Sequence, residues 1–117
     1  MAGMISSKFL AGALLTAAAC TAGNAAAGEW SCTNEPETGS KTKWMLSLRD
    51  DGSKWTGKLS DGEIDIALSD VKLEGGTLTF RFFINTKPYT FSGRADSGEI
   101  VGKYSGEEAH GTLRCQK

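Results

Sequence analysis

The segment KTKWMLSLRDDGSKWTGKLS, at residues 41–60, restricts the possible folds more than any other part of the chain. Apolar and polar residues alternate with a period of two on both sides of a central Asp-Asp-Gly-Ser sequence. Such alternation is typical of β-strands with one buried face, and a short connection rich in Asp and Gly is typical of a hairpin turn. The pattern therefore predicts two antiparallel strands that place Trp44 and Trp55 on the same, inward face.

The same alternation recurs along the rest of the chain in short runs separated by turn signals. The expected strands lie at residues 29–33, 41–49, 54–60, 63–73, 77–84, 89–95, 99–105 and 110–116. Within the fourth run, Ile64, Ile66 and Leu68 are expected to face inward. The alternation then shifts by one residue, so we expect a bulge or bend at Ser69-Asp70. Eight short strands without helical periodicity predict an all-β domain.

Residues 1–27 have the features of a signal peptide. Lys8 supplies a positive charge, Phe9–Ala19 is apolar, and Ala25-Ala26-Ala27 forms a small-residue cleavage site. The apolar run is too short to cross a hydrocarbon layer of roughly 30 Å as a helix, so no membrane span is expected. A structural N-terminal helix is the alternative interpretation of this segment.

Cleavage before Gly28 would leave a single domain, residues 28–117, in the periplasm or secreted. This part of the chain is long enough for one small domain and no more. The sequence Ala17-Ala18-Ala19-Cys20 also partly resembles a lipoprotein signal, in which Cys20 would carry a lipid anchor. Lipidation at Cys20 therefore stays open as an alternative.

The other two of the three cysteines predict how the sheet closes. Cys32 lies in the first expected strand and Cys115 in the last, and an even pair in an exported chain predicts a disulfide. The two strands must then be neighbours, because the Cα atoms of a disulfide lie within about 7 Å of each other. We therefore predict an eight-stranded antiparallel up-and-down β-barrel closed by this bond. A two-sheet β-sandwich of the same strands is the alternative.

Composition and motifs narrow the function. With 13 basic and 14 acidic residues the formal net charge is −1, so nucleic-acid binding is not predicted. The single histidine, His110, is not accompanied by a nucleophile motif, the carboxylates cluster at turns, and no Cys/His cluster has zinc spacing. We predict no catalytic residues, no metal, no cofactor and no enzymatic activity.

Aromatic side chains gather on the predicted inner face. They are Trp44, Trp55, Phe80, Phe82, Tyr89, Phe91 and Tyr104. The interior of an eight-stranded barrel is either filled by its own side chains or holds one small ligand, and both possibilities remain open. In the second case Trp44, Trp55, Phe82, Tyr89 and Tyr104 would contact a small apolar or amphipathic ligand, with indole and hydroxyl groups as polar contacts.

A different class of function remains as the alternative. The polar segment Asn34–Ser40, with Pro36 and Gly39 as breakers, is expected to form a mobile loop. Loops on a rigid scaffold often carry binding residues. The chain would then be a protein-facing module, such as an inhibitor of an envelope or host enzyme, with a protein partner.

The spacing of three segments resembles a known group of barrels. Gly28-Glu29-Trp30, Gly39-Ser40 and Asp51-Gly52-Ser53-Lys54-Trp55-Thr56-Gly57 resemble the opening of avidin-type barrels, within the calycin group of lipocalin-like ligand binders. This resemblance spans residues 28–57. It implies an exported up-and-down barrel that binds a small apolar or amphipathic molecule at its open end, with Asn34 and Ser40 as polar ligand contacts. The aromatic lid of the avidins has no clear counterpart here.

Overall fold

The computed structural model describes residues 26–117. All but the last two residues of the predicted signal peptide, and the predicted lipid anchor at Cys20, lie outside the described residues. Within residues 26–117, no helix has the length and apolar character needed to cross a membrane.

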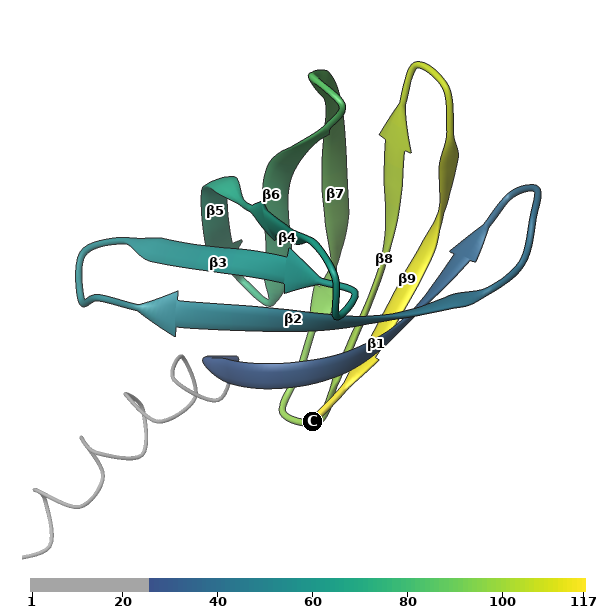
Figure 1. Ribbon diagram of the computed structural model, residues 1–117. Coiled ribbons are helices and arrows are strands. Elements are labelled where there is room, and N and C mark those ends of the chain that lie inside the picture. The colour runs from purple at the N-terminus through teal and green to yellow at the C-terminus, as the bar shows by residue number, and fades with distance from the viewer. Residues whose placement is uncertain (1–25) are drawn as a thin grey trace, which may run out of the picture.

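The described chain forms nine antiparallel strands in one continuous sheet (Figure 1). They are β1 (Gly28–Pro36), β2 (Thr42–Asp50), β3 (Trp55–Ser60), β4 (Asp65–Ala67), β5 (Ser69–Glu74), β6 (Thr77–Ile84), β7 (Lys87–Ala95), β8 (Glu99–Gly106) and β9 (His110–Gln116). Their order in the sheet is β4-β3-β2-β1-β9-β8-β7-β6-β5. The first and last strands of the chain are therefore neighbours near the middle of the sheet.

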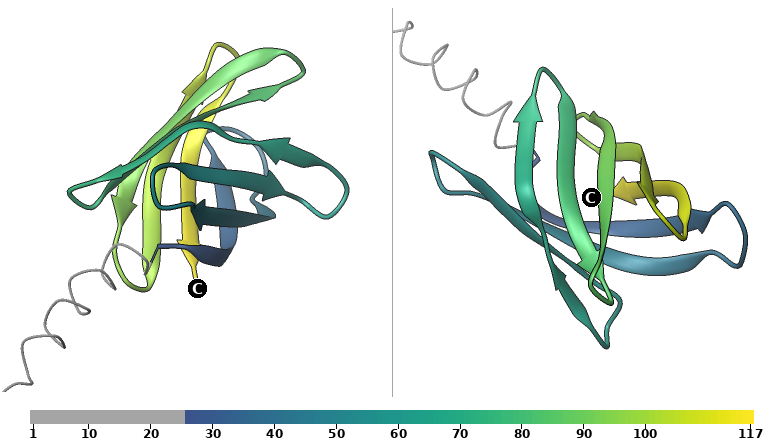
Figure 2. Two further views of the ribbon diagram at one scale, coloured as in Figure 1. Left: turned by 90° about the vertical axis from the view of Figure 1, so that its left-hand side faces the viewer. Right: turned by 90° about the horizontal axis from the view of Figure 1, so that it is seen from above.

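The sheet curls into a nearly closed barrel. In Figure 1 β2 and β3 run across the direction of β6–β8, and Figure 2 shows the same crossing from two further sides. The two edge strands, β4 and β5, follow each other in the chain and are separated only by Leu68. The Leu68 N–H donates to the carbonyl oxygen of Gly57 at 3.0 Å, which ties this joint to β3. The predicted all-β barrel is confirmed, and the two-sheet alternative is excluded because one sheet contains all nine strands.

The strand count differs from the prediction because one expected strand is split. The run at residues 63–73 forms β4 and β5, which pair with different neighbours, β3 and β6. Asp70 has a φ of 52°, and the register with β6 shifts between Ser69 and Lys72, as a bulge at Ser69-Asp70 requires. Ile64 lies in the turn before β4 and is 51% exposed, so its predicted inward position is wrong.

The first strand is longer than predicted, because β1 continues through Asn34 to Pro36. The pairing of β1 with β2 ends at Asn34 opposite Thr42, whereas its pairing with β9 continues to Pro36 opposite Gly111. Pro36 thus lies where β1 has a neighbour on one side only, the position in a sheet that tolerates a missing N–H. The expected loop at 34–40 is correspondingly shorter and covers residues 37–41.

The disulfide lies at the junction of β1 and β9. Cys32 and Cys115 are direct cross-strand partners, bonded to each other, with their Cα atoms 4.0 Å apart. This confirms the predicted pairing. The two cysteines belong to one buried core cluster, which also includes the buried side chains of Trp30, Leu46, Leu48, Leu78, Phe80, Phe91 and Ile100. Short type I′-like turns at Gly75-Gly76 and Asn85-Thr86, all with positive φ, join the strands on either side of β6.

Candidate functional site

An apolar cavity of about 240 Å³ opens at one end of the barrel. Its lining residues come from β1, β2, β3, β4, β6, β7, β8, β9 and the β8–β9 turn. They are Asn34, Pro36, Trp44, Leu59, Ile66, Phe82, Ile84, Tyr89, Phe91, Tyr104, Ala109 and Leu113. Among the described residues that line the cavity, none carries a charged side chain.

The cavity lies at the end of the barrel where the β1–β2, β3–β4, β6–β7 and β8–β9 turns are found. The β6–β7 and β8–β9 turns are at the top of Figure 1. Pro36, Ile84 and Ala109 lie next to three of these turns and also line the cavity. These three turns therefore form the rim of a mouth, and eight of the nine strands, all except β5, form its sides.

Three neighbouring strands, β6, β7 and β8, supply an aromatic wall. Phe82 and Tyr89 are cross-strand partners, and their rings stack at a centroid distance of 5.3 Å and an interplanar angle of 11°. Tyr104 on β8 lies 6.4 Å from Tyr89 in a tilted arrangement. Deeper in the barrel, Phe91 stacks on Phe80 at 4.6 Å. Inward positions on adjacent strands thus place their rings in contact.

Two glycines make room for the tyrosine rings. Tyr89 lies opposite Gly106, where an added Cβ would come within 2.7 Å of the tyrosine ring. Tyr104 lies opposite Gly111, where an added Cβ would come within 2.8 Å of the tyrosine hydroxyl oxygen. Each tyrosine therefore occupies space that a side chain on the facing strand would otherwise fill.

A chain of neutral hydrogen bonds crosses the cavity wall from β8 to β2. The Tyr104 hydroxyl donates to Asn34 Oδ1 at 2.7 Å, and Asn34 Nδ2 donates to Thr42 Oγ1 at 3.2 Å. The Trp44 indole N–H donates to the same Thr42 oxygen at 3.1 Å. These bonds orient Asn34, Trp44 and Tyr104 relative to one another on three strands.

Burial raises the pKa of Tyr104 above its ordinary value of 10.0. The hydrogen bond with Asn34 lowers this pKa in part, and the neighbouring Tyr89 raises it further. Because removal from water disfavours the phenolate, Tyr104 keeps its proton at neutral pH. It therefore acts as the donor in its bond to Asn34.

Tyr89 differs from Tyr104 in its polar contacts. Its side chain is 8% exposed, yet within residues 26–117 its hydroxyl forms no hydrogen bond. In the same part of the chain, no polar side-chain atom is both fully buried and unpartnered. The Tyr89 hydroxyl oxygen must therefore remain accessible, and since Tyr89 lines the cavity, it is available to a molecule in the mouth.

The structure brings together five of the seven predicted ligand-binding residues and leaves two outside. The five that line the cavity are Asn34, Trp44, Phe82, Tyr89 and Tyr104. Trp55 begins β3 opposite Asp50, next to the β2–β3 turn at the other end of the barrel, and does not line the cavity. Ser40 is exposed in the β1–β2 turn and does not line it either.

Sequence reasoning missed the aliphatic part of the lining. The residues concerned are Pro36, Leu59, Ile66, Ile84, Ala109 and Leu113, together with Phe91, which was expected inside the barrel but not at the site. Alternation placed Leu59, Ile66 and Ile84 on the inner face. The register between strands decides which end of the barrel each side chain lies at. The alternation of apolar and polar residues gives no information on this register.

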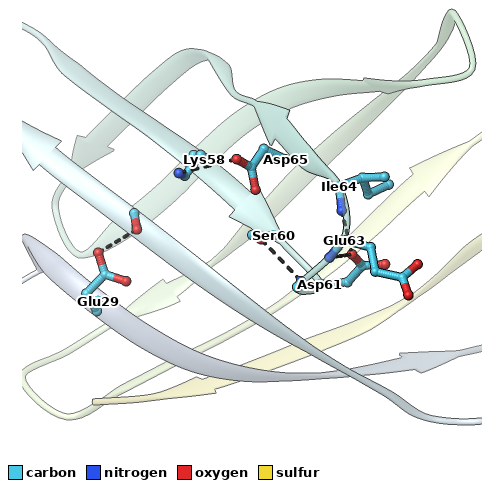
Figure 3. Close-up of polar contacts among 9 residues, drawn as sticks. Glu29, Lys58, Ser60, Asp61, Glu63, Ile64 and Asp65 are labelled. Carbon is cyan, nitrogen blue, oxygen red and sulfur yellow. Dashed lines mark hydrogen bonds and ion pairs between the residues drawn. The ribbon is translucent and has the colours of Figure 1, made fainter.

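The β3–β4 turn is held by hydrogen bonds from its backbone N–H groups to the Asp61 side chain (Figure 3). Asp61 Oδ1 accepts hydrogen bonds from the N–H groups of Glu63 and Ile64, both at 2.9 Å. These bonds lower the pKa of Asp61 below its usual 3.8, because they favour the carboxylate. Lys58 and Asp65, on the strands that flank the turn, form an exposed ion pair at 3.6 Å.

Two close contacts between basic and acidic side chains lie at the mouth, outside the cavity lining. Lys87 Nζ lies 2.6 Å from a Glu108 carboxylate oxygen, and His110 Nε2 lies 3.2 Å from one of Glu37. His110 is exposed on the outer face, opposite Ser105 on β8. In the described part of the chain, no group of three or more His, Cys, Asp or Glu residues is placed to hold a metal ion.

The sequence matches no protein-family model and no curated protein. The resemblance of residues 28–57 to calycin barrels therefore stays a prediction. The function must be argued from the cavity itself.

Proposed function

We propose that this protein binds a small apolar or amphipathic molecule in the mouth of its barrel, as an exported carrier or sensor. One observation carries the proposal: the barrel has a buried core that includes the disulfide, yet it keeps an aromatic-lined cavity at one end. A concave apolar site with a few polar groups is the usual form of a small-molecule site.

The cavity volume indicates a small ligand. Pockets for drug-sized molecules measure roughly 300–1,000 Å³, whereas an engineered apolar cavity of roughly 150 Å³ accepts benzene. The cavity of about 240 Å³ lies between these limits. We therefore expect a ligand of one or two rings or an equivalent short apolar group, and not a long lipid.

An extracytoplasmic location suits the proposal. The Cys32–Cys115 disulfide in a small barrel is compatible with an oxidising, extracellular environment. Together with the predicted signal peptide it supports a periplasmic or secreted carrier or sensor. Mass spectrometry of the N-terminus of the exported protein would test this location, and would also detect a lipid on Cys20.

Tryptophan fluorescence tests ligand binding with a matched pair of variants. Trp44 lines the cavity, whereas Trp55 lies at the other end of the barrel. Titration with the neutral two-ring probe 1-naphthylamine should give saturable energy transfer from tryptophan to the probe. Trp44→Phe should lower both the transfer and the affinity, whereas Trp55→Phe should leave the affinity unchanged. If the wild-type protein shows no saturable binding, or both variants behave alike, the proposal fails.

Native mass spectrometry addresses the natural ligand. Protein purified from the exporting host should retain a small-molecule adduct that is lost on mild denaturation. The Trp44→Phe variant should retain less of this adduct than Trp55→Phe.

Exposed apolar side chains near the mouth favour a second candidate, a protein-facing surface. Phe83 is 52% exposed beside the β6–β7 turn, and Ile64 is 51% exposed in the β3–β4 turn. Exposed apolar groups on a rigid scaffold are suitable contacts for an enzyme that the protein would inhibit. In a pull-down with envelope fractions, the Phe83→Ala/Ile64→Ala variant should lose a partner that Trp44→Phe still captures. Equal capture by both variants would count against this candidate.

A further inference from the structure

The cavity has three properties that together select a chemical class of ligand, and this inference rests on the proposed function. The first property is its lack of charge. No Asp, Glu, Lys, Arg or His belongs to the lining formed by residues 26–117, and Lys87 and His110 on the rim lie against the carboxylates of Glu108 and Glu37. Burying an ionised group without a partner is costly. A charged ligand would therefore be rejected.

The second property is the aromatic wall formed by three rings. The Phe82 and Tyr89 rings are nearly parallel, and the edge of this stack is completed by the tilted ring of Tyr104. Aromatic rings prefer offset stacked or edge-to-face contacts, and both arrangements are available to a planar ligand in this mouth. The volume of about 240 Å³ suits one substituted ring or two fused rings.

The third property is the single unpartnered hydroxyl at the site. Within the described chain, the Tyr104 hydroxyl is engaged by Asn34, and the Asn34 and Trp44 donors are engaged by Thr42. The Tyr89 hydroxyl has no such partner, although its side chain is nine-tenths buried. Because the hydroxyl oxygen itself remains accessible from the mouth, a polar atom of a ligand can form a hydrogen bond with it that no protein group forms.

We propose that the ligand is an uncharged aromatic molecule of one or two fused rings whose polar substituent exchanges a hydrogen bond with the Tyr89 hydroxyl. Phe82 and Tyr89 supply the stacking surface, and Leu59, Ile66 and Leu113 enclose the far side of the ring. Gly106 has a positioning role, because its lack of a side chain lets the Tyr89 ring lie against β8.

Three isosteric probes test this inference by calorimetry or competition at pH 7. They are naphthalene, 2-naphthol and 2-naphthoate. We expect 2-naphthol to bind about two- to tenfold more tightly than naphthalene, the range expected for one net hydrogen bond. We expect 2-naphthoate to bind at least roughly a hundredfold more weakly than 2-naphthol, because its carboxylate would be buried without a partner.

Two tyrosine variants separate the hydroxyl from the ring. Tyr89→Phe keeps the ring on Phe82 and should remove the advantage of 2-naphthol over naphthalene without changing naphthalene binding. Tyr104→Phe is the matched control, and the advantage should survive in it because Asn34 already holds that hydroxyl. Thermal unfolding of both variants checks that each remains folded.

The outcomes separate this inference from the proposed function. Saturable binding of 1-naphthylamine with equal affinities for 2-naphthol and 2-naphthoate overturns the inference alone. A naphthol preference that persists in Tyr89→Phe also overturns it. If neither the fluorescent probe nor naphthalene binds the wild-type protein, both the inference and the proposed function are wrong.

Discussion

The two ends of the barrel are built from the same alternating strands but use their inward positions differently. At the closed end, which contains both ends of the described chain, Trp30 is fully buried and donates its indole N–H to the Ala26 carbonyl oxygen at 2.9 Å. The Lys117 ammonium lies 5.3 Å from the centre of the same ring. At the open end, Trp44 and Tyr104 are only partly buried and face the cavity. One end therefore carries the stability, and the other has room for a ligand.

Removing the disulfide should cause the largest loss of stability, because the bond lies in the closed end and also constrains the whole unfolded chain. The bond joins residues 83 positions apart. The double variant Cys32→Ser/Cys115→Ser should lose on the order of 4–5 kcal/mol of unfolding free energy by the chain-entropy estimate. Urea denaturation under oxidising conditions measures this loss. Reduced wild-type protein should match the variant, and an unchanged midpoint would show that the bond does not constrain the fold.

Two phenylalanines on one strand compare the ends directly. Phe80 is 2% exposed and lies outside the cavity lining, whereas Phe82 lines the cavity. Phe80→Ala should cost about 3–5 kcal/mol of unfolding free energy, as is typical of a packed core. Phe82→Ala should cost less, about 2 kcal/mol, because its void joins an existing opening. Phe82→Ala should also weaken probe binding, and equal stability losses would argue against two distinct ends.

Two glycines on β8 sharpen the comparison. An added Cβ on Gly102 would meet the Cα of Gly93 and the carbonyl oxygen of Ser92, each at 2.5 Å. Gly102→Ala must therefore move a strand and should cost roughly 1–3 kcal/mol of unfolding free energy. Gly106→Ala should cost less, because part of the clash falls on the Tyr89 ring, but it should displace that ring and weaken probe binding.

Gly98 provides the control for both glycine variants. An added Cβ on Gly98 meets nothing within 4 Å, so Gly98→Ala should leave stability and probe binding unchanged. If Gly102→Ala is as well tolerated as Gly98→Ala, the close approach of β7 and β8 is not a requirement of the fold.

The smallest expected effect is a pH dependence at the open end. Burial raises the pKa of Tyr104 in the folded state, so the native protein holds this proton more tightly than the unfolded chain does. The resulting stability is fully present below about pH 10 and is lost as the pH rises through the folded-state pKa. As the pH is raised from 8 to 11, the urea concentration at the unfolding midpoint should fall less steeply for Tyr104→Phe than for the wild-type protein. Parallel slopes would contradict a raised pKa.

Local pattern was sufficient to predict the inner wall. Phe80, Phe82, Tyr89 and Phe91 alternate with polar residues, and all four are buried. The disulfide was predicted from an even pair of cysteines in an exported chain, and closure of the sheet followed because bonded cysteines must lie on neighbouring strands. These features depend only on which face of its own strand each residue occupies. The alternation of apolar and polar residues shows this directly.

The site was predictable only in part, because it depends on which end of the barrel a residue reaches. Trp44 and Trp55 both lie on the inner face of the sheet, yet of these two only Trp44 lines the cavity. Their separation comes from strand tilt and register, which are properties of the closed sheet. Ile64 was misplaced for a local reason: Asp61 binds the backbone N–H groups of the turn, so β4 starts at Asp65.

The joint at Leu68 has a consequence for motion. The ring of paired strands is interrupted between β4 and β5, where the Leu68 N–H donates to the carbonyl oxygen of Gly57 on β3. A cylinder with one such seam can widen sideways while its remaining ladders stay intact. Amide protons of β4 and β5 should therefore exchange with solvent before those of β7 and β8, and the lumen should be able to adjust its diameter to its occupant.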